Sequence, residues 1–120
     1  MLGAPGAAQL ARRIVGPGRS LHAPHLIDLE VAQVLRRYVA SQEIPAVRAG
    51  QALDDFRRIP ITRYPHAVLL PRIWQLRERL TAYDAAYVAL AEAIDAPLLT
   101  ADARLGRSHG HDARIEVAVP

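Results

Sequence analysis

Short apolar stretches alternate with longer amphipathic segments along this chain of 120 residues, and this alternation most constrains its fold. The longer segments carry apolar residues at helical spacing. They cover residues 27–40, 45–59, 67–80 and 85–95. The short stretches have the length and bounding residues of buried strands. They cover residues 20–23, 60–64, 98–100 and 115–119. Helices that separate strands predict an α/β layer structure with a mostly parallel sheet.

The chain begins with an alanine-rich stretch, and residues 7–15 (AAQLARRIV) favour a helix that ends at the breaker Gly16-Pro17-Gly18. The length suits a single domain over residues 1–120. No apolar run reaches the length of a membrane helix, and the first residues lack the order of a signal peptide. We therefore expect a cytoplasmic protein without a membrane partner.

All 15 basic residues are arginine, and the formal net charge is +3. The chain contains no cysteine, which excludes disulfides and thiolate zinc sites. Guanidinium groups bind phosphate through two parallel hydrogen bonds, so nucleic acid is a plausible partner. Arg36 and Arg37 are our candidates for contacts to RNA phosphates. A solvated helix face explains the same two residues equally well.

Three acids stand at the ends of predicted elements. Glu30 lies in the first turn of a helix, Asp84 at the start of the alanine-rich helix and Asp102 directly after a strand. The carboxyl ends of parallel strands and the adjacent helix starts gather at one edge of such a sheet, so these acids can converge. Carboxylate oxygens suit Mg²⁺ or Mn²⁺. Carboxylates packed together repel each other, so if these acids share a metal site, replacing one by asparagine would raise stability.

Each acid also has a purely structural interpretation. The helix dipole favours Glu30 in a first turn, Thr81 and Asp84 have the spacing of a capping box, and Asp102 can cap a short helix. His109 and His111 form an alternative metal-binding pair in a polar loop.

The stretches "PHLIDLEVAQVLRR" (24–37), "ITRYP" (61–65) and "LTAYDAAYVALAEAIDAPLLTAD" (80–102) closely resemble PIN-domain ribonucleases, and most of all the VapC-type toxins of type II toxin–antitoxin systems. The resemblance implies a three-layer α/β/α fold, a dimer, a VapB-type antitoxin as partner, and RNA cleavage with Mg²⁺ or Mn²⁺ held by four acids. The second, third and fourth of these acids map onto Glu30, Asp84 and Asp102. Thr100 matches a hydroxyl residue that commonly precedes the fourth.

The chain departs from the family at its beginning. The family opens with an apolar strand that ends in aspartate, whereas this chain has no acid before Asp28. We therefore expect the first strand to be missing, Met1 to fall inside the family's usual reading frame, and the middle of the sheet to lack a strand. Asp28 is a poor substitute, because residues i and i+2 of a helix point apart.

These observations leave three interpretations. The first is a metal-dependent endoribonuclease toxin, weakly active or inactive as the 120-residue chain because one acid is absent. The second is a non-catalytic module that binds antitoxin or RNA as a decoy, and the third is a gene remnant. For a helical antitoxin segment, residues 27–40 and 45–59 are the predicted walls of a groove.

Overall fold

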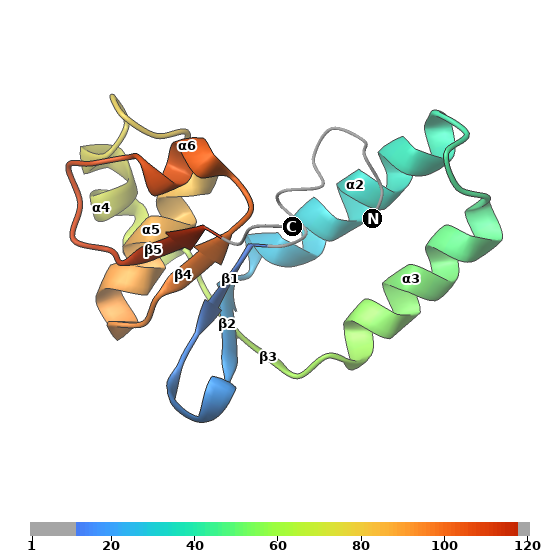
Figure 1. Ribbon diagram of the computed structural model, residues 1–120, viewed down its shortest axis with the longest axis horizontal. Coiled ribbons are helices and arrows are strands. Elements are labelled where there is room, and N and C mark those ends of the chain that lie inside the picture. Colours follow the sequence, from blue (N-terminus) through green and yellow to red (C-terminus); the bar gives the residue numbers. More distant parts are fainter. Residues whose placement is uncertain (1–11, 118–120) are drawn as a thin grey trace.

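A five-stranded mixed sheet forms the centre of the computed structural model, which describes residues 12–117 (Figure 1). The strands are β1 (Arg13–Val15), β2 (Leu21–Pro24), β3 (Ile61–Tyr64), β4 (Leu98–Thr100) and β5 (Ile115–Val117). Their order is β3-β2-β1-β4-β5. The pairs β2–β3 and β4–β5 are parallel, whereas β1 is antiparallel to both of its neighbours. Four strands therefore run in one direction, which confirms the mostly parallel sheet.

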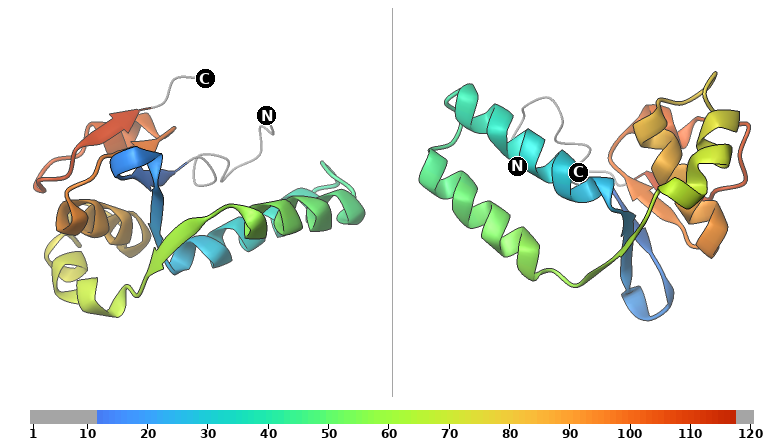
Figure 2. Two further views of the ribbon diagram at one scale, coloured as in Figure 1. Left: turned by 90° about the horizontal axis from the view of Figure 1, so that it is seen from below. Right: turned by 180° about the vertical axis from the view of Figure 1, so that it is seen from behind.

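Helices cover this sheet and extend beyond it. They are α2 (Leu26–Ala40), α3 (Ala46–Arg58), α4 (Leu70–Gln75), α5 (Ala82–Ile94) and α6 (Ala103–Gly106), with short 3₁₀ turns at Pro17–Arg19 and Ala67–Leu69. Helix α5 packs across β1, β2 and β4, and α6 packs against β4 and β5. Figure 2 shows α4 outside α5, and α2 and α3 side by side as they run away from the sheet. The predicted α/β/α class is confirmed.

The two helices that carry candidate acids form for different local reasons. Helix α2 is amphipathic, and its buried residues recur every three or four positions, as at Ile27, Val31 and Val34. Helix α5 begins where the Thr81 side chain accepts a hydrogen bond from a backbone N–H, and it is buried on all sides from residue 85 to residue 91. Small alanine side chains let α5 approach the sheet closely.

The structure corrects the prediction for the beginning of the chain. Residues 13–15 form strand β1 and not a helix; residues 7–11 lie outside the described residues. Strand β1 occupies the middle of the sheet, where we expected no strand, and pairs Ile14 with His22 on one side and Leu98 on the other. Ile14 is completely buried. Helix propensity is a weak preference, and the unpaired backbone groups of β2 and β4 outweigh it here.

Two further predicted elements are shorter in the structure. The helix predicted over residues 67–80 is a 3₁₀ turn followed by α4, with Pro71 in the first turn as expected, and it ends at Gln75. Strand β5 ends at Val117, and the rest of the predicted strand lies outside the described residues. Over the described range, no helix combines the length and the apolar character that crossing a membrane requires.

Candidate functional site

Glu30 and Asp84 lie close together although they are far apart in the sequence. Glu30 projects from the second turn of α2, not from the first turn as predicted, because α2 already begins at Leu26; Asp84 projects from the first turn of α5 as expected. The backbone N–H of Asp84 donates to Thr81 Oγ1 over 3.1 Å, which fixes the beginning of α5. The predicted convergence of these two acids is therefore present.

A guanidinium group stands between the two carboxylates. Arg12 Nη2 donates to Glu30 Oε2 over 2.7 Å, and Arg12 Nη1 donates to Asp84 Oδ1. Arg12 is only 4% exposed, against 14% for the Glu30 side chain and 27% for that of Asp84. The position between these acids, which the sequence assigns to a metal ion, is thus taken by a cation of the chain itself.

Tyr87 covers this ion pair from α5, one turn after Asp84. Its ring centroid lies 4.0 Å from Arg12 Cζ, a cation–π contact, and its hydroxyl donates to Glu30 Oε1 over 2.7 Å. Burial alone would lower the pKa of Arg12, but the charges of Glu30 and Asp84 outweigh it and raise that pKa above its ordinary value. Burial and the charge of Glu30 raise the pKa of Tyr87, so its hydroxyl stays a donor.

Asp102 is held separately, at the end of β4. Its backbone N–H donates to Thr100 Oγ1 over 3.0 Å, and its carboxylate accepts from the backbone N–H of Arg104 over 2.9 Å. Asp102 therefore caps α6, which confirms the structural interpretation, while about a quarter of its side chain stays exposed. Burial would raise the pKa of Asp102, yet its hydrogen bonds with Arg104 bring it below the usual value. Thr100 is 1% exposed and anchors this turn.

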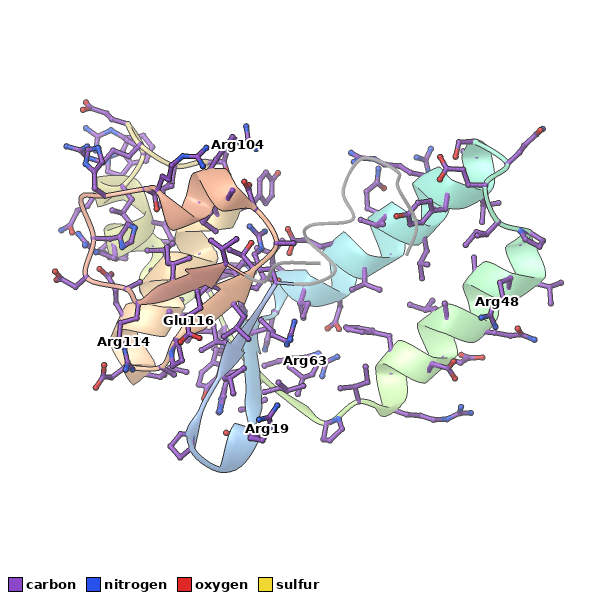
Figure 3. All side chains as sticks on the ribbon, in the orientation of Figure 1. Arg19, Arg48, Arg63, Arg104, Arg114 and Glu116 are labelled. Carbon is purple, nitrogen blue, oxygen red and sulfur yellow. The ribbon has the colours of Figure 1, made fainter. Side chains whose placement is uncertain are left out.

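Asp84 and Asp102 line one open pocket of about 440 Å³. Basic side chains surround the two acids: the pocket is also lined by Arg79, Arg104, Arg107 and His109. Figure 3 shows Arg104 on α6, far from Arg48 on α3. A pocket lined by two acids and several basic side chains is suited to an anionic ligand that is also bound through a cation.

Glu30 lines a different pocket, of about 420 Å³, together with Arg37 and Tyr83. The structure thus pairs Glu30 with Asp84 across Arg12, and Asp84 with Asp102 across the first pocket. Between residues 12 and 117, no three histidine or acidic side chains lie close enough together to hold a metal ion. The chemistry of the carboxylates fits a hard cation, but Arg12 fills the position between two of them.

The two arginines predicted to touch RNA face different surfaces. Both are exposed on α2. Arg37 lines the pocket of Glu30, whereas Arg36 lines a groove between α2 and α3. Only Arg37 of this pair therefore lies next to an acid of the candidate site.

The alternative ligands are engaged elsewhere. Asp28 accepts hydrogen bonds from Arg63 over 2.8 and 2.9 Å, in agreement with the expectation that it points away from Glu30. His109 hydrogen-bonds to Arg79 and His111 to Ser108, so this pair does not converge on one point.

Arg12 and Tyr87 are the site residues that sequence reasoning did not identify. Tyr87 stands three residues after Asp84, so its position on the same face of α5 was readable from helical spacing. For Arg12 no such local signal exists, because its contact with the acids depends on β1 entering the sheet.

Comparisons with known proteins agree with this fold. A family model described as "PIN domain" matches residues 1–109. Three similar relatives come from Mycobacterium tuberculosis. Ribonuclease VapC9 is 48% identical over 79% of this chain and 74% of its own length, Ribonuclease VapC1 is 44% identical over 97% and 88%, and Ribonuclease VapC12 is 41% identical over 98% and 89%. No solved structure matches the chain. With its mostly parallel sheet and these relatives, the chain belongs to the PIN domain family, among proteins of the VapC type.

Proposed function

We propose that this protein is a metal-dependent endoribonuclease of a toxin–antitoxin system, with Glu30, Asp84 and Asp102 as its metal-binding acids. One observation carries the proposal: Asp84 and Asp102 line an open pocket that is also lined by arginines, and Glu30 lies beside Asp84. The relatives named VapC are ribonucleases by name. Two acids of this chain line the same pocket as several arginines, so a cation and an RNA phosphate could be bound there together.

The residues around the acids have distinct roles in this proposal. Asp84 and Asp102 would hold Mg²⁺ or Mn²⁺ in the pocket that both line, and Glu30, which lines a different pocket beside Asp84, is the third acid of the set. When bound, such an ion supplies an activated water and neutralises charge on the phosphoryl group. Thr100 fixes the turn that carries Asp102, and Tyr87 orients the Glu30 carboxylate through its hydroxyl.

Arginines supply the contacts to RNA in this proposal. Arg79, Arg104 and Arg107 line the same pocket as the two aspartates, so they can bind phosphates next to the one that is cut. Arg37 can do so on the side of Glu30, whereas Arg36 would contact phosphate from the other surface of α2, at the edge of the groove toward α3. Because phosphate contacts are independent of base sequence, these residues set affinity, not sequence preference.

The proposed protein partners are a VapB-type antitoxin and a second copy of the chain. Between α2 and α3 lies a largely apolar groove of about 410 Å³, and an amphipathic antitoxin helix fits such a groove. It is lined in part by Leu35, Val39 and Leu53. Leu29, Leu70 and Tyr83 are more than half exposed around another apolar pocket, which is suited to a homodimer contact.

A non-catalytic binding module is the second candidate, and Arg12 is the observation that favours it. Because Arg12 occupies the position between Glu30 and Asp84, we expect the chain from Met1 to cleave RNA weakly or not at all. In that case the basic pocket would bind RNA, and the groove would bind antitoxin, without chemistry.

The two candidates are separated by cleavage of a mixed RNA pool with Mn²⁺, with the chelator EDTA as control. We expect slow cleavage that Mn²⁺ supports and that Asp102→Asn abolishes. The matched control is Asp54→Asn, because Asp54 is exposed on α3 and makes only a 4.0 Å ion pair. Cleavage that survives EDTA or Asp102→Asn would refute the assigned site. RNA binding without any cleavage, in both the unaltered chain and Arg12→Met, would establish the binding module instead.

A further inference from the structure

We infer that the Arg12 guanidinium is the resident cation of the acid site, which consists of Glu30 and Asp84, and that this guanidinium and a divalent metal ion exclude each other there. The inference rests on the proposed function, because it assigns Glu30 and Asp84 to a metal site. It adds that the chain's own residue decides which cation the site holds.

The geometry makes the two cations alternatives. The two terminal nitrogens of Arg12 are each directed at a different carboxylate, one on α2 and one on α5. A magnesium ion contacts carboxylate oxygens at about 2.0–2.1 Å, which is shorter than the 2.7 Å from Arg12 Nη2 to Glu30 Oε2. An ion that touches both acids would therefore lie within the volume of the guanidinium.

Arg12 is tethered to this position. It directly precedes β1, and the pairing of Arg13 and Ile14 with β4, together with that of Ile14 with β2, fixes the backbone at the centre of the sheet. A tethered group has a high effective concentration, so it competes with a dissolved ion more effectively than free guanidinium would. The Tyr87 ring further limits the directions in which Arg12 can leave.

The hydrogen bonding of the Arg12 guanidinium is nevertheless incomplete. Arg12 Nε is buried and has no hydrogen-bond partner among the described residues. Removing such a group from water costs free energy that the ion pairs only partly offset. One guanidinium also leaves a single negative charge on two carboxylates, whereas a divalent ion would neutralise both. Arg12 therefore weakens metal binding without making it impossible.

The experiment measures binding of Mn²⁺ alone to the 120-residue chain, by calorimetry and by the loss of the free-ion electron paramagnetic resonance signal. The test variant is Arg12→Met, which keeps much of the side-chain volume and removes the charge. Arg63→Met is the matched control, since Arg63 forms a similar pair with Asp28, has a side chain that is 28% exposed, and belongs to β3, outside the acid site (Figure 3). Both substitutions change the net charge equally.

We expect Arg12→Met to bind Mn²⁺ at least about ten-fold more tightly than the unaltered chain, because the competing cation is gone. Arg63→Met should bind as the unaltered chain does, and adding Asp84→Asn to Arg12→Met should remove the gain. Equal affinity of Arg12→Met and the unaltered chain would overturn the inference, as would an equal gain in Arg63→Met, which would show a general charge effect.

A second variant covers the case in which Arg12→Met fails to fold, as judged by circular dichroism. Arg12→Lys keeps the charge but cannot donate to both carboxylates through a planar fork, so its Mn²⁺ affinity should lie above that of the unaltered chain. Unchanged affinity in that variant would also overturn the inference. Tighter Mn²⁺ binding without any RNA cleavage would support the inference and refute the proposed ribonuclease.

Discussion

Replacing Asp84 by asparagine should destabilise the protein, and the contacts of Arg12 give the size of the effect. Asp84 accepts a charge-assisted hydrogen bond from a guanidinium that is 4% exposed. Such a bond contributes about 1.5–3 kcal/mol, and a neutral one about 0.5–1.5 kcal/mol. Because asparagine keeps an acceptor oxygen at this position and Glu30 still balances the charge of Arg12, we expect a loss of about 1–1.5 kcal/mol.

The measurement is urea unfolding followed by far-ultraviolet circular dichroism, without added metal. Asp102→Asn is the matched control, because asparagine caps a helix about as well as aspartate and Asp102 lies outside the Arg12 contact. The control should change stability by less than about 0.5 kcal/mol.

A double-mutant cycle with Arg12→Met tests the cause. In the Arg12→Met background, Asp84→Asn should no longer destabilise, because the carboxylate then faces only Glu30 and repels it. The sequence alone favours the opposite sign for the single substitution, since it suggests carboxylates that repel each other with no cation of the chain between them. An Asp84→Asn protein as stable as the unaltered chain, or more stable, would show that Arg12 does not compensate these acids.

Two other contacts give predictions of their own. Glu92 accepts two hydrogen bonds from Arg72 at 2.8 Å, and the hydrogen bonds with Arg72 lower its pKa from the ordinary 4.5 despite burial. A carboxylate whose pKa is lowered in the folded state stabilises the protein above about pH 4.5, and this stabilisation disappears as the pH falls through the folded-state pKa. Glu92→Gln should therefore cost about 1 kcal/mol of stability at about pH 7. An equal cost at about pH 7 and about pH 3 in thermal unfolding would show that the pair of Glu92 and Arg72 does not contribute. Thr100→Val removes the buried hydroxyl that accepts from the Asp102 N–H. The substitution should lower the free energy of unfolding by about 1–2 kcal/mol and speed hydrogen exchange of the Asp102 amide. Unchanged exchange of that amide would show that Thr100 does not anchor this turn.

Several parts of the fold could be predicted from the sequence because they depend on patterns of neighbouring residues. Helix α2 follows from apolar residues at helical spacing, and the beginning of α5 follows from Thr81 with Asp84 three residues later. The cap by Asp102 was equally predictable, because an aspartate directly before a short helix accepts from the next backbone N–H groups. Such features depend on residues within one or two turns of each other.

The helix predicted at the beginning of the chain is wrong because that prediction rested on local signals alone. A stretch rich in alanine favours a helix locally, but Arg13, Ile14 and Val15 lie between two strands that need hydrogen-bond partners. The strand in the centre of the sheet is therefore decided by backbone groups that come from distant parts of the sequence.

The sequence by itself determined the α/β class, the helices that carry the acids, and the chemistry available to the site: three carboxylates, a supporting threonine and many arginines. Tertiary structure alone decided which of these groups meet. It placed Arg12 between Glu30 and Asp84, left Asp102 outside that contact in a pocket that it shares with Asp84, and directed Asp28 to Arg63. The physical reason is that spacing sets which side of a helix a residue occupies, whereas the cation that balances a buried carboxylate depends on how strands and helices pack together.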